Sequence, residues 1–96
     1  MYVTISSNRT FPRQRPQVEA FLEGFLPRLR NFRGVRAIHH YLRPDHGDDV
    51  TIIIWNNEEA VRAYRASALI REAEDFERAQ QSRSVREGYP LALSLL

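Results

Sequence analysis

The chain has 96 residues, no cysteine and a formal net charge of +2. Its length leaves room for one domain, predicted over residues 1–96, and for one small core, while the absence of cysteine excludes disulfide frameworks and thiolate chemistry. Every one of the 14 basic residues is arginine, but acidic residues are interleaved with them, which argues against a nucleic-acid partner. No stretch reads as a signal peptide or approaches the ~20 apolar residues of a membrane span, so we expect a cytoplasmic protein without a membrane partner.

The first third of the chain predicts a strand and then a helix. Residues 2–7 alternate polar with β-branched and aromatic side chains, which is typical of a strand. A helix is expected to begin near Pro16 and to end before Gly34. Pro27 lies inside this helix, where its ring crowds a preceding carbonyl, so we expect a kink or break near Gly24. The stripe predicted to face the core consists of Val18, Phe21, Leu22, Phe25, Leu26 and Leu29.

The middle of the chain predicts a hairpin whose second strand is apolar on both faces. Residues 35–42 predict its first strand and residues 43–49 its loop. In the second strand one side carries Val50, Ile52 and Ile54, and the other side carries Ile53 and Trp55. Helices of the chain itself can cover one face, and we expect a second copy of the protein or a ligand to cover the other.

Two helices and a last strand are predicted after the hairpin. Asn57 is expected to cap a helix that begins with two glutamates, and Ser67 to start a second helix after a short interruption. The inward residues of this second helix are Leu69, Ile70, Ala73 and Phe76. A final strand is predicted over residues 89–96, after a polar stretch at residues 80–87.

This order of elements predicts an α+β fold, the ferredoxin-like split βαββαβ arrangement with helices on one face of an antiparallel sheet. Two such sheets packed face to face would bury the uncovered faces in a homodimer that resembles a barrel. Each subunit would bury ~800 Å² of largely apolar surface, which is ample to drive association.

Three segments of the chain resemble the antibiotic biosynthesis monooxygenase domain, a dimeric α/β-barrel family. They are Thr51–Ala60 (TIIIWNNEEA), Tyr64–Ser67 before an amphipathic helix, and Asn31–Val35 at the exit of the first helix. The resemblance covers nearly the whole chain. This domain is known as cofactor-independent oxygenases of aromatic polyketides or quinols, as haem-degrading enzymes, and as proteins with no assigned activity.

The resemblance argues against haem degradation. In the haem-degrading branch an Asn at the end of the first strand, a Trp on the helix after the third strand and a His that binds iron carry the chemistry. Asn8 matches the first position, but Tyr64 stands where the Trp would be and Glu74 where the His would be. We therefore expect no cofactor.

The quinol-oxidising branch implies a pocket between sheet and helices for a small hydrophobic or aromatic ligand. There a phenol-like substrate loses a proton, and the resulting electron-rich anion reduces oxygen directly. Such a reaction needs a dry cavity, a hydrogen bond to the phenolate and a base.

Six residues are candidates for this site. The candidate catalytic residues are Asn8, Tyr64 and His40, and the candidate substrate-binding residues are Trp55, Arg71 and His39. Because His39 and His40 are neighbours on a strand, they point to opposite faces, and the sequence leaves open which of them faces the pocket. Each candidate has a structural alternative: a turn for Asn8, core packing for Trp55 and Tyr64, and solvent exposure for Arg71.

Two other kinds of function stay open at this point. The first is a non-catalytic dimer that binds a small ligand or regulates. The second is RNA binding on the open sheet face, although RNA-recognition domains carry aromatic residues on the central strand, where Val50–Ile54 is aliphatic. His46 and the aspartates around it could bind a metal, but a hairpin turn explains them more simply, so no metal is expected.

Overall fold

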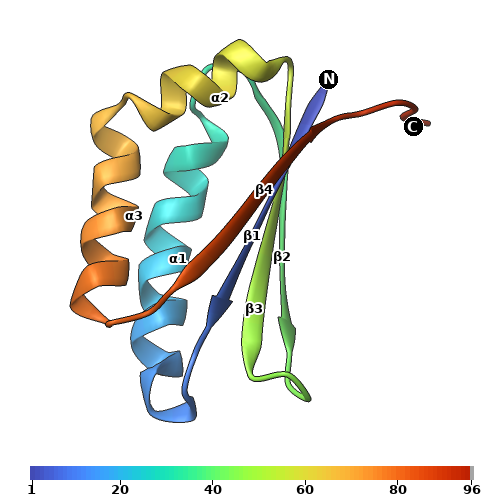
Figure 1. The fold of residues 1–96 in the computed structure, drawn as a ribbon. Coiled ribbons are helices and arrows are strands. Elements are labelled where there is room, and N and C mark those ends of the chain that lie inside the picture. The colour runs from blue at the N-terminus through green and yellow to red at the C-terminus, as the bar shows by residue number, and fades with distance from the viewer. Residues whose placement is uncertain (96) are drawn as a thin grey trace.

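The computed structural model describes residues 1–95 as a sheet covered on one face by a layer of helices (Figure 1). In chain order, the elements are β1 (Tyr2–Arg9), a 3-10 turn (Pro12–Gln14), α1 (Arg15–Arg30), β2 (Val35–Arg43), β3 (Asp48–Trp55), α2 (Glu58–Arg65), α3 (Ala68–Ala79) and β4 (Ser84–Pro90). Helices α1 and α3 lie side by side, and α2 crosses one end of the pair (Figure 1).

The sheet has the strand order β2-β3-β1-β4, and every neighbouring pair is antiparallel. The two central strands are therefore β1 and β3, with Ile5 opposite Ile52 and Val3 opposite Ile54. This is the ferredoxin-like α+β fold, so the predicted fold class is confirmed.

The core lies between the sheet and the helices, and β3 supplies its centre. Trp55 is only 1% exposed, and Ile53 lies on the same helix-facing side of the strand. The predicted alternation along β3 is thus confirmed. Burying each large apolar side chain stabilises the fold by about 2 kcal/mol. The buried hydrophobic cluster consists of Phe25, Leu29, Val35, Ile53, Trp55, Val61, Tyr64 and Ile70.

The predicted caps of α2 and α3 are confirmed. The Asn57 side-chain oxygen accepts a hydrogen bond from the Ala60 N–H at 2.9 Å, and the Ser67 hydroxyl accepts one from the Ile70 N–H at 3.4 Å. Each bond satisfies a helical N–H that has no partner within the helix. The polypeptide therefore turns from the buried β3 into both helices where the sequence predicts.

The predicted break in α1 is wrong, since the helix runs without interruption through Pro27. Pro27 lies in the last turn, so its missing N–H removes one hydrogen bond near the end of the helix. Phe25 and Leu29 flank the proline and are both buried in the core. Their packing holds the helical path across the proline.

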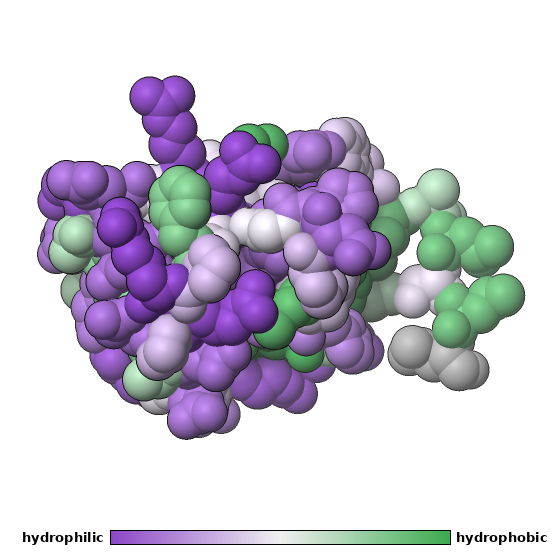
Figure 2. All heavy atoms as spheres, turned by 90° about the horizontal axis from the view of Figure 1, so that it is seen from below, coloured by the Kyte–Doolittle hydropathy of each residue, from purple (hydrophilic) through white to green (hydrophobic). Residues whose placement is uncertain are grey.

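The predicted position of the last strand is also wrong. β4 comprises residues 84–90, most of which lie in the stretch expected to be a polar connection, and residues 91–95 form no strand. β4 is held by backbone pairing with β1, which does not require apolar side chains. After β4, Leu93 and Leu95 are exposed, with Leu95 at 84%, and Figure 2 shows this hydrophobic segment extending from a mostly hydrophilic surface.

The sheet face opposite the helices carries an apolar surface. Its central side chains, Ile52 and Ile54, are half-buried, and on the edge strand Val85 and Tyr89 are exposed. No helix of residues 1–95 covers this face (Figure 1). None of the helices in the same range is long and apolar enough to cross a membrane.

Candidate functional site

A cavity of about 120 Å³ lies between the sheet and the helices. Its wall is mostly apolar and comes from α1, β1, β3 and the two later helices. A single water molecule needs about 10–15 Å³ of such space, so the cavity has room for several waters or for an apolar group. The apolar residues that line it include Phe21, Leu22, Phe25, Leu29, Ile53 and Ile70.

One end of the cavity is polar and is built by the end of β1 and the start of β3. Asn8 is opposite Asp49 in the register of the two strands, and its amide nitrogen donates a hydrogen bond to the Asp49 carboxylate at 3.2 Å. The Thr10 hydroxyl donates to the other carboxylate oxygen at 3.0 Å. The Asn8 amide oxygen in turn accepts a hydrogen bond from the Ser84 hydroxyl on β4. These four side chains form one hydrogen-bonded cluster.

An aromatic group occupies the other end. Trp55 is six residues beyond Asp49 on β3, about 20 Å along the strand. The Trp55 indole N–H donates to the Thr4 hydroxyl at 2.9 Å, and the Trp55 ring lies 5.5 Å from the ring of Tyr64. The Tyr64 hydroxyl is protonated at neutral pH and can donate a hydrogen bond, and burial raises its pKa to about 12, so it keeps the proton in alkaline solution as well.

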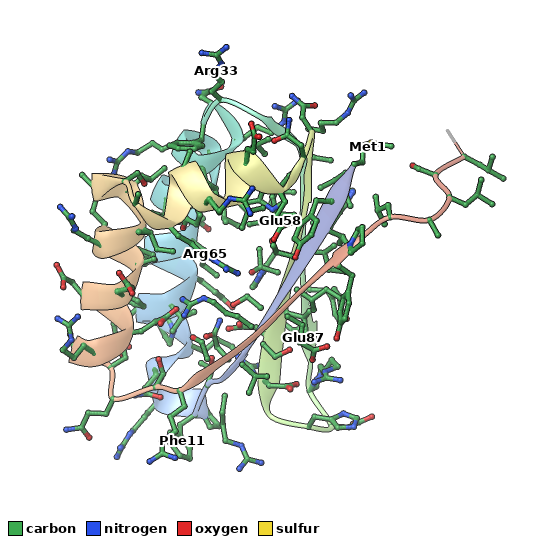
Figure 3. All side chains as sticks on the ribbon, turned by 45° about the horizontal axis from the view of Figure 1, so that its top comes forward. Met1, Phe11, Arg33, Glu58, Arg65 and Glu87 are labelled. Carbon is green, nitrogen blue, oxygen red and sulfur yellow. The ribbon has the colours of Figure 1, made fainter. Side chains whose placement is uncertain are left out.

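Exposed arginines are found among the residues that line the cavity. Arg65 extends from the end of α2 into the space between the helices and the sheet (Figure 3), and Arg86 comes from β4. Arg86 is paired with Glu77 of α3 at 2.6 Å, which links β4 to the helical layer. The wall of the cavity thus includes guanidinium groups, which can interact with an anionic ligand.

The structure brings three of the six candidate residues to the cavity. Asn8, Tyr64 and Trp55 all line it, although Asn8 lies at the polar end and Trp55 at the aromatic end. Tyr64 and Trp55 come from a helix and a strand that the sequence predicts, whereas Asn8 lies in a strand, β1, that extends past the predicted residues 2–7.

The other three candidates lie elsewhere. His40 is on the helix-facing side of β2 but lines a separate hollow beside α1, and it reaches the main cavity only through Thr51, whose hydroxyl is 2.9 Å from its Nδ1. His39 is exposed on the open face of the sheet, opposite Ile52. Arg71 is exposed on α3 and does not line the cavity. Among residues 1–95, no group of three or more His, Cys, Asp or Glu residues could hold a metal ion.

Sequence reasoning missed two charged groups of the cavity wall, Asp49 and Arg86. Asp49 continues the alternation of Thr51, Ile53 and Trp55, so the strand pattern contained the signal for its inward position. The loop predicted over residues 43–49 nevertheless includes Asp49. Arg86 could not be found, because its strand was placed too late in the chain.

Comparison of sequences finds no family model and no curated protein that matches the chain. Solved structures with a similar fold cover nearly its whole length. A candidate antibiotic biosynthesis monooxygenase from Deinococcus radiodurans is 12% identical and has a TM-score of 0.90 over 100% of this chain and 97% of that chain. SnoaB, a cofactor-independent oxygenase from Streptomyces nogalater, is 20% identical and has a TM-score of 0.69 over 98% of this chain and 96% of that chain.

A protein of unknown function from Nitrosomonas europaea is similar as well, at 17% identity and a TM-score of 0.79, over 99% of this chain and 92% of that chain. At such identities a similar structure defines the fold and leaves the activity open. The resemblance seen in the sequence is therefore confirmed at this level: the chain has the fold of the antibiotic biosynthesis monooxygenase proteins.

Proposed function

We propose that this protein is a cofactor-independent monooxygenase that acts on a quinol-like or polyketide aromatic substrate. The observation that carries the proposal is the mostly apolar cavity with Asn8 fixed at its polar end. The description of SnoaB as a cofactor-independent oxygenase adds support from a protein of the same fold.

The cavity supplies the environment that such a reaction needs. Apolar and aromatic walls exclude water and offer ring faces to an aromatic substrate. The amide nitrogen of Asn8 carries two N–H groups, and one of them donates to Asp49. The second can donate to a phenolate oxygen of the substrate, and it stabilises the negative charge that forms there.

The substrate itself supplies the electrons. Loss of the phenolic proton leaves an electron-rich anion that reduces molecular oxygen, and the reduced oxygen then bonds to a ring carbon. One oxygen atom stays in the product, and the other leaves as water with two hydrogens from the substrate, so no external reductant takes part. The protein binds and orients the substrate and excludes water from it.

We also propose that the working unit is a homodimer joined through the open sheet face. The apolar side chains of this face, together with the exposed Leu93 and Leu95 after β4, support the proposal. A standard interface buries ~800 Å² on each partner. The cytoplasmic location stays a prediction from the sequence.

Oxygen consumption tests the proposed activity. Protein treated with a chelator is incubated with a set of dihydroxynaphthalenes and hydroxyanthrones in an oxygen electrode. We expect uptake above the protein-free rate and a decrease of about 10- to 100-fold in Asn8→Ala, because one positioned hydrogen-bond donor is lost. Asn31→Ala changes an exposed asparagine beyond the end of α1 and should retain the wild-type rate. Equal rates with and without protein would contradict the proposal.

A further inference from the structure

Asp49 is the one buried acidic side chain among residues 1–95, with 1% of its surface exposed. It lies in the cavity wall, on the helix-facing side of β3. Taking a carboxylate out of water is costly unless hydrogen bonds or a cation compensate it. Its partners therefore decide what it can do.

The partners of Asp49 are neutral and incomplete. Each carboxylate oxygen accepts one hydrogen bond, from Asn8 and from Thr10. An ionised carboxylate has about four acceptor positions, so about two stay open. The ion pairs within residues 1–95 do not include Asp49. Arg86, one of the arginines of the cavity wall, is paired with Glu77.

The other candidate bases of the site are less suitable. His40 lies outside the main cavity, behind Thr51. Tyr64 is protonated at neutral pH, as any tyrosine is, and burial raises its pKa further, to about 12. Glu77 lines the cavity but is held by Arg86 at 2.6 Å. Asp49 is thus the acceptor with open positions next to the apolar space.

We propose that Asp49 binds the hydroxyl group of an aromatic ligand and accepts its proton. This inference rests on the proposed function and names the base of that reaction. The O–H bond of the ligand breaks, a new O–H bond forms on the Asp49 carboxylate, and the electron pair stays on the phenolate oxygen. Asn8 and Thr10 position the carboxylate, and the free N–H of Asn8 then faces the oxygen that has become charged.

Ligand binding under argon tests this assignment without any turnover. The probes are 2-naphthol and its methyl ether, 2-methoxynaphthalene, which has the same ring system but no hydroxyl proton. Wild-type protein should bind naphthol at least tenfold more tightly than the ether, since a hydrogen bond to a charged acceptor is lost with the ether. Calorimetry measures both dissociation constants.

Two variants test whether Asp49 causes the preference for naphthol over the ether. Asp49→Asn should reduce it to within about threefold, whereas Asp48→Asn removes the same charge from the neighbouring residue on the opposite face and should retain it. Thermal unfolding checks that each variant is folded. Equal affinity of the wild type for both probes, or an unchanged preference in Asp49→Asn, would overturn the assignment.

A measurement on the wild type keeps the proposal testable if Asp49→Asn does not fold. The side-chain carboxyl carbon resonance of Asp49 should move on addition of naphthol and stay in place with the ether. A resonance that responds equally to both probes would contradict the contact. A preference for naphthol in a protein that consumes no oxygen would refute the oxygenase and leave the Asp49 assignment in place. Oxygen consumption by a protein that binds both probes equally would support the oxygenase and refute the Asp49 assignment.

Discussion

At the scale of single residues, Asn8 shows how position in a strand changes the meaning of a side chain. The sequence offered a turn as its simplest explanation, but β1 continues through Arg9, and the amide of Asn8 is bonded at both ends to neighbouring strands. A side chain held in this way is pre-organised, so its remaining N–H keeps a fixed direction. Asn8 is therefore the residue on which the proposed chemistry depends most.

The position of a candidate residue at the cavity could be predicted where the sequence also predicts its strand. Trp55 and Asn8 belong to strands with a clear alternation, and both line the cavity. The side of His40 follows from the same alternation, but its distance from the cavity depends on how α1 packs over β2, which no local pattern records. Whether Arg71 faces the cavity or solvent likewise depends on how α3 is rotated about its axis, and the residue is exposed.

Tyr64 carries a prediction about pH. Its pKa is raised by burial from 10.0 to about 12, so the folded state holds the proton more tightly than the unfolded state does. This stabilisation is fully present below pH 10 and is lost as the pH rises toward 12, a change of about 2 kcal/mol.

Denaturant unfolding at pH 8, 10 and 11.5 measures this loss. Tyr64→Phe has no group to ionise at this site, so its free energy of unfolding should fall less steeply with pH than that of the wild type. Tyr41→Phe, on the exposed face, should follow the wild type. Identical slopes for the wild type and Tyr64→Phe would show that the tyrosine is not buried.

At the scale of elements, the passage from β3 into α2 and α3 could be predicted because strong local signals agree there. A buried apolar run is followed by Asn57 and Ser67, which cap the two helices. The errors occur where tertiary context overrides local sequence. The core packing of Phe25 and Leu29 carries α1 through its proline, and β4 is held by pairing with β1 rather than by apolar side chains.

Substitution by alanine is expected to have opposite effects on the free energy of unfolding at Gly34 and at Gly24. Gly34 has φ +96°, and a Cβ there would lie 2.5 Å from the Cβ of Ala60. Gly34→Ala should therefore lower the free energy of unfolding by about 1–3 kcal/mol, through backbone strain and a clash with α2.

Gly24 is the matched position. It lies inside α1, and a Cβ there would meet nothing within 4 Å. Gly24→Ala should raise the free energy of unfolding by about 0.5–1 kcal/mol, because alanine loses less backbone entropy in a helix. Urea denaturation of both variants compares the two effects, and a loss of stability at Gly24 as large as that at Gly34 would be inconsistent with this packing.

At the scale of the whole molecule, the open sheet face remains to be explained. The apolar character of both faces of β3 could be seen in the sequence, and the structure places helices on one face only. A small domain that leaves such a face in water is less stable than one that pairs it. The homodimer stays a prediction that this surface supports.

Light scattering coupled to gel filtration measures the oligomeric state. The wild type should elute with about twice the mass of one 11.3 kDa chain. Val85→Glu puts a charge on the open face, where Val85 is 61% exposed, and should shift the protein toward monomer. Ala63→Glu puts the same charge on the exposed side of α2 and should remain dimeric. A monomeric wild type at all workable concentrations would contradict the dimer.

The central claim is that the cavity promotes direct oxygenation of an aromatic substrate, and isotope labelling tests it most directly. Chelator-treated protein is supplied with a hydroxyanthrone under ¹⁸O₂, and the product is analysed by mass spectrometry. The account predicts one ¹⁸O atom in each product molecule, at a yield that depends on Asn8. Product without ¹⁸O, or labelling at the protein-free rate, would contradict it.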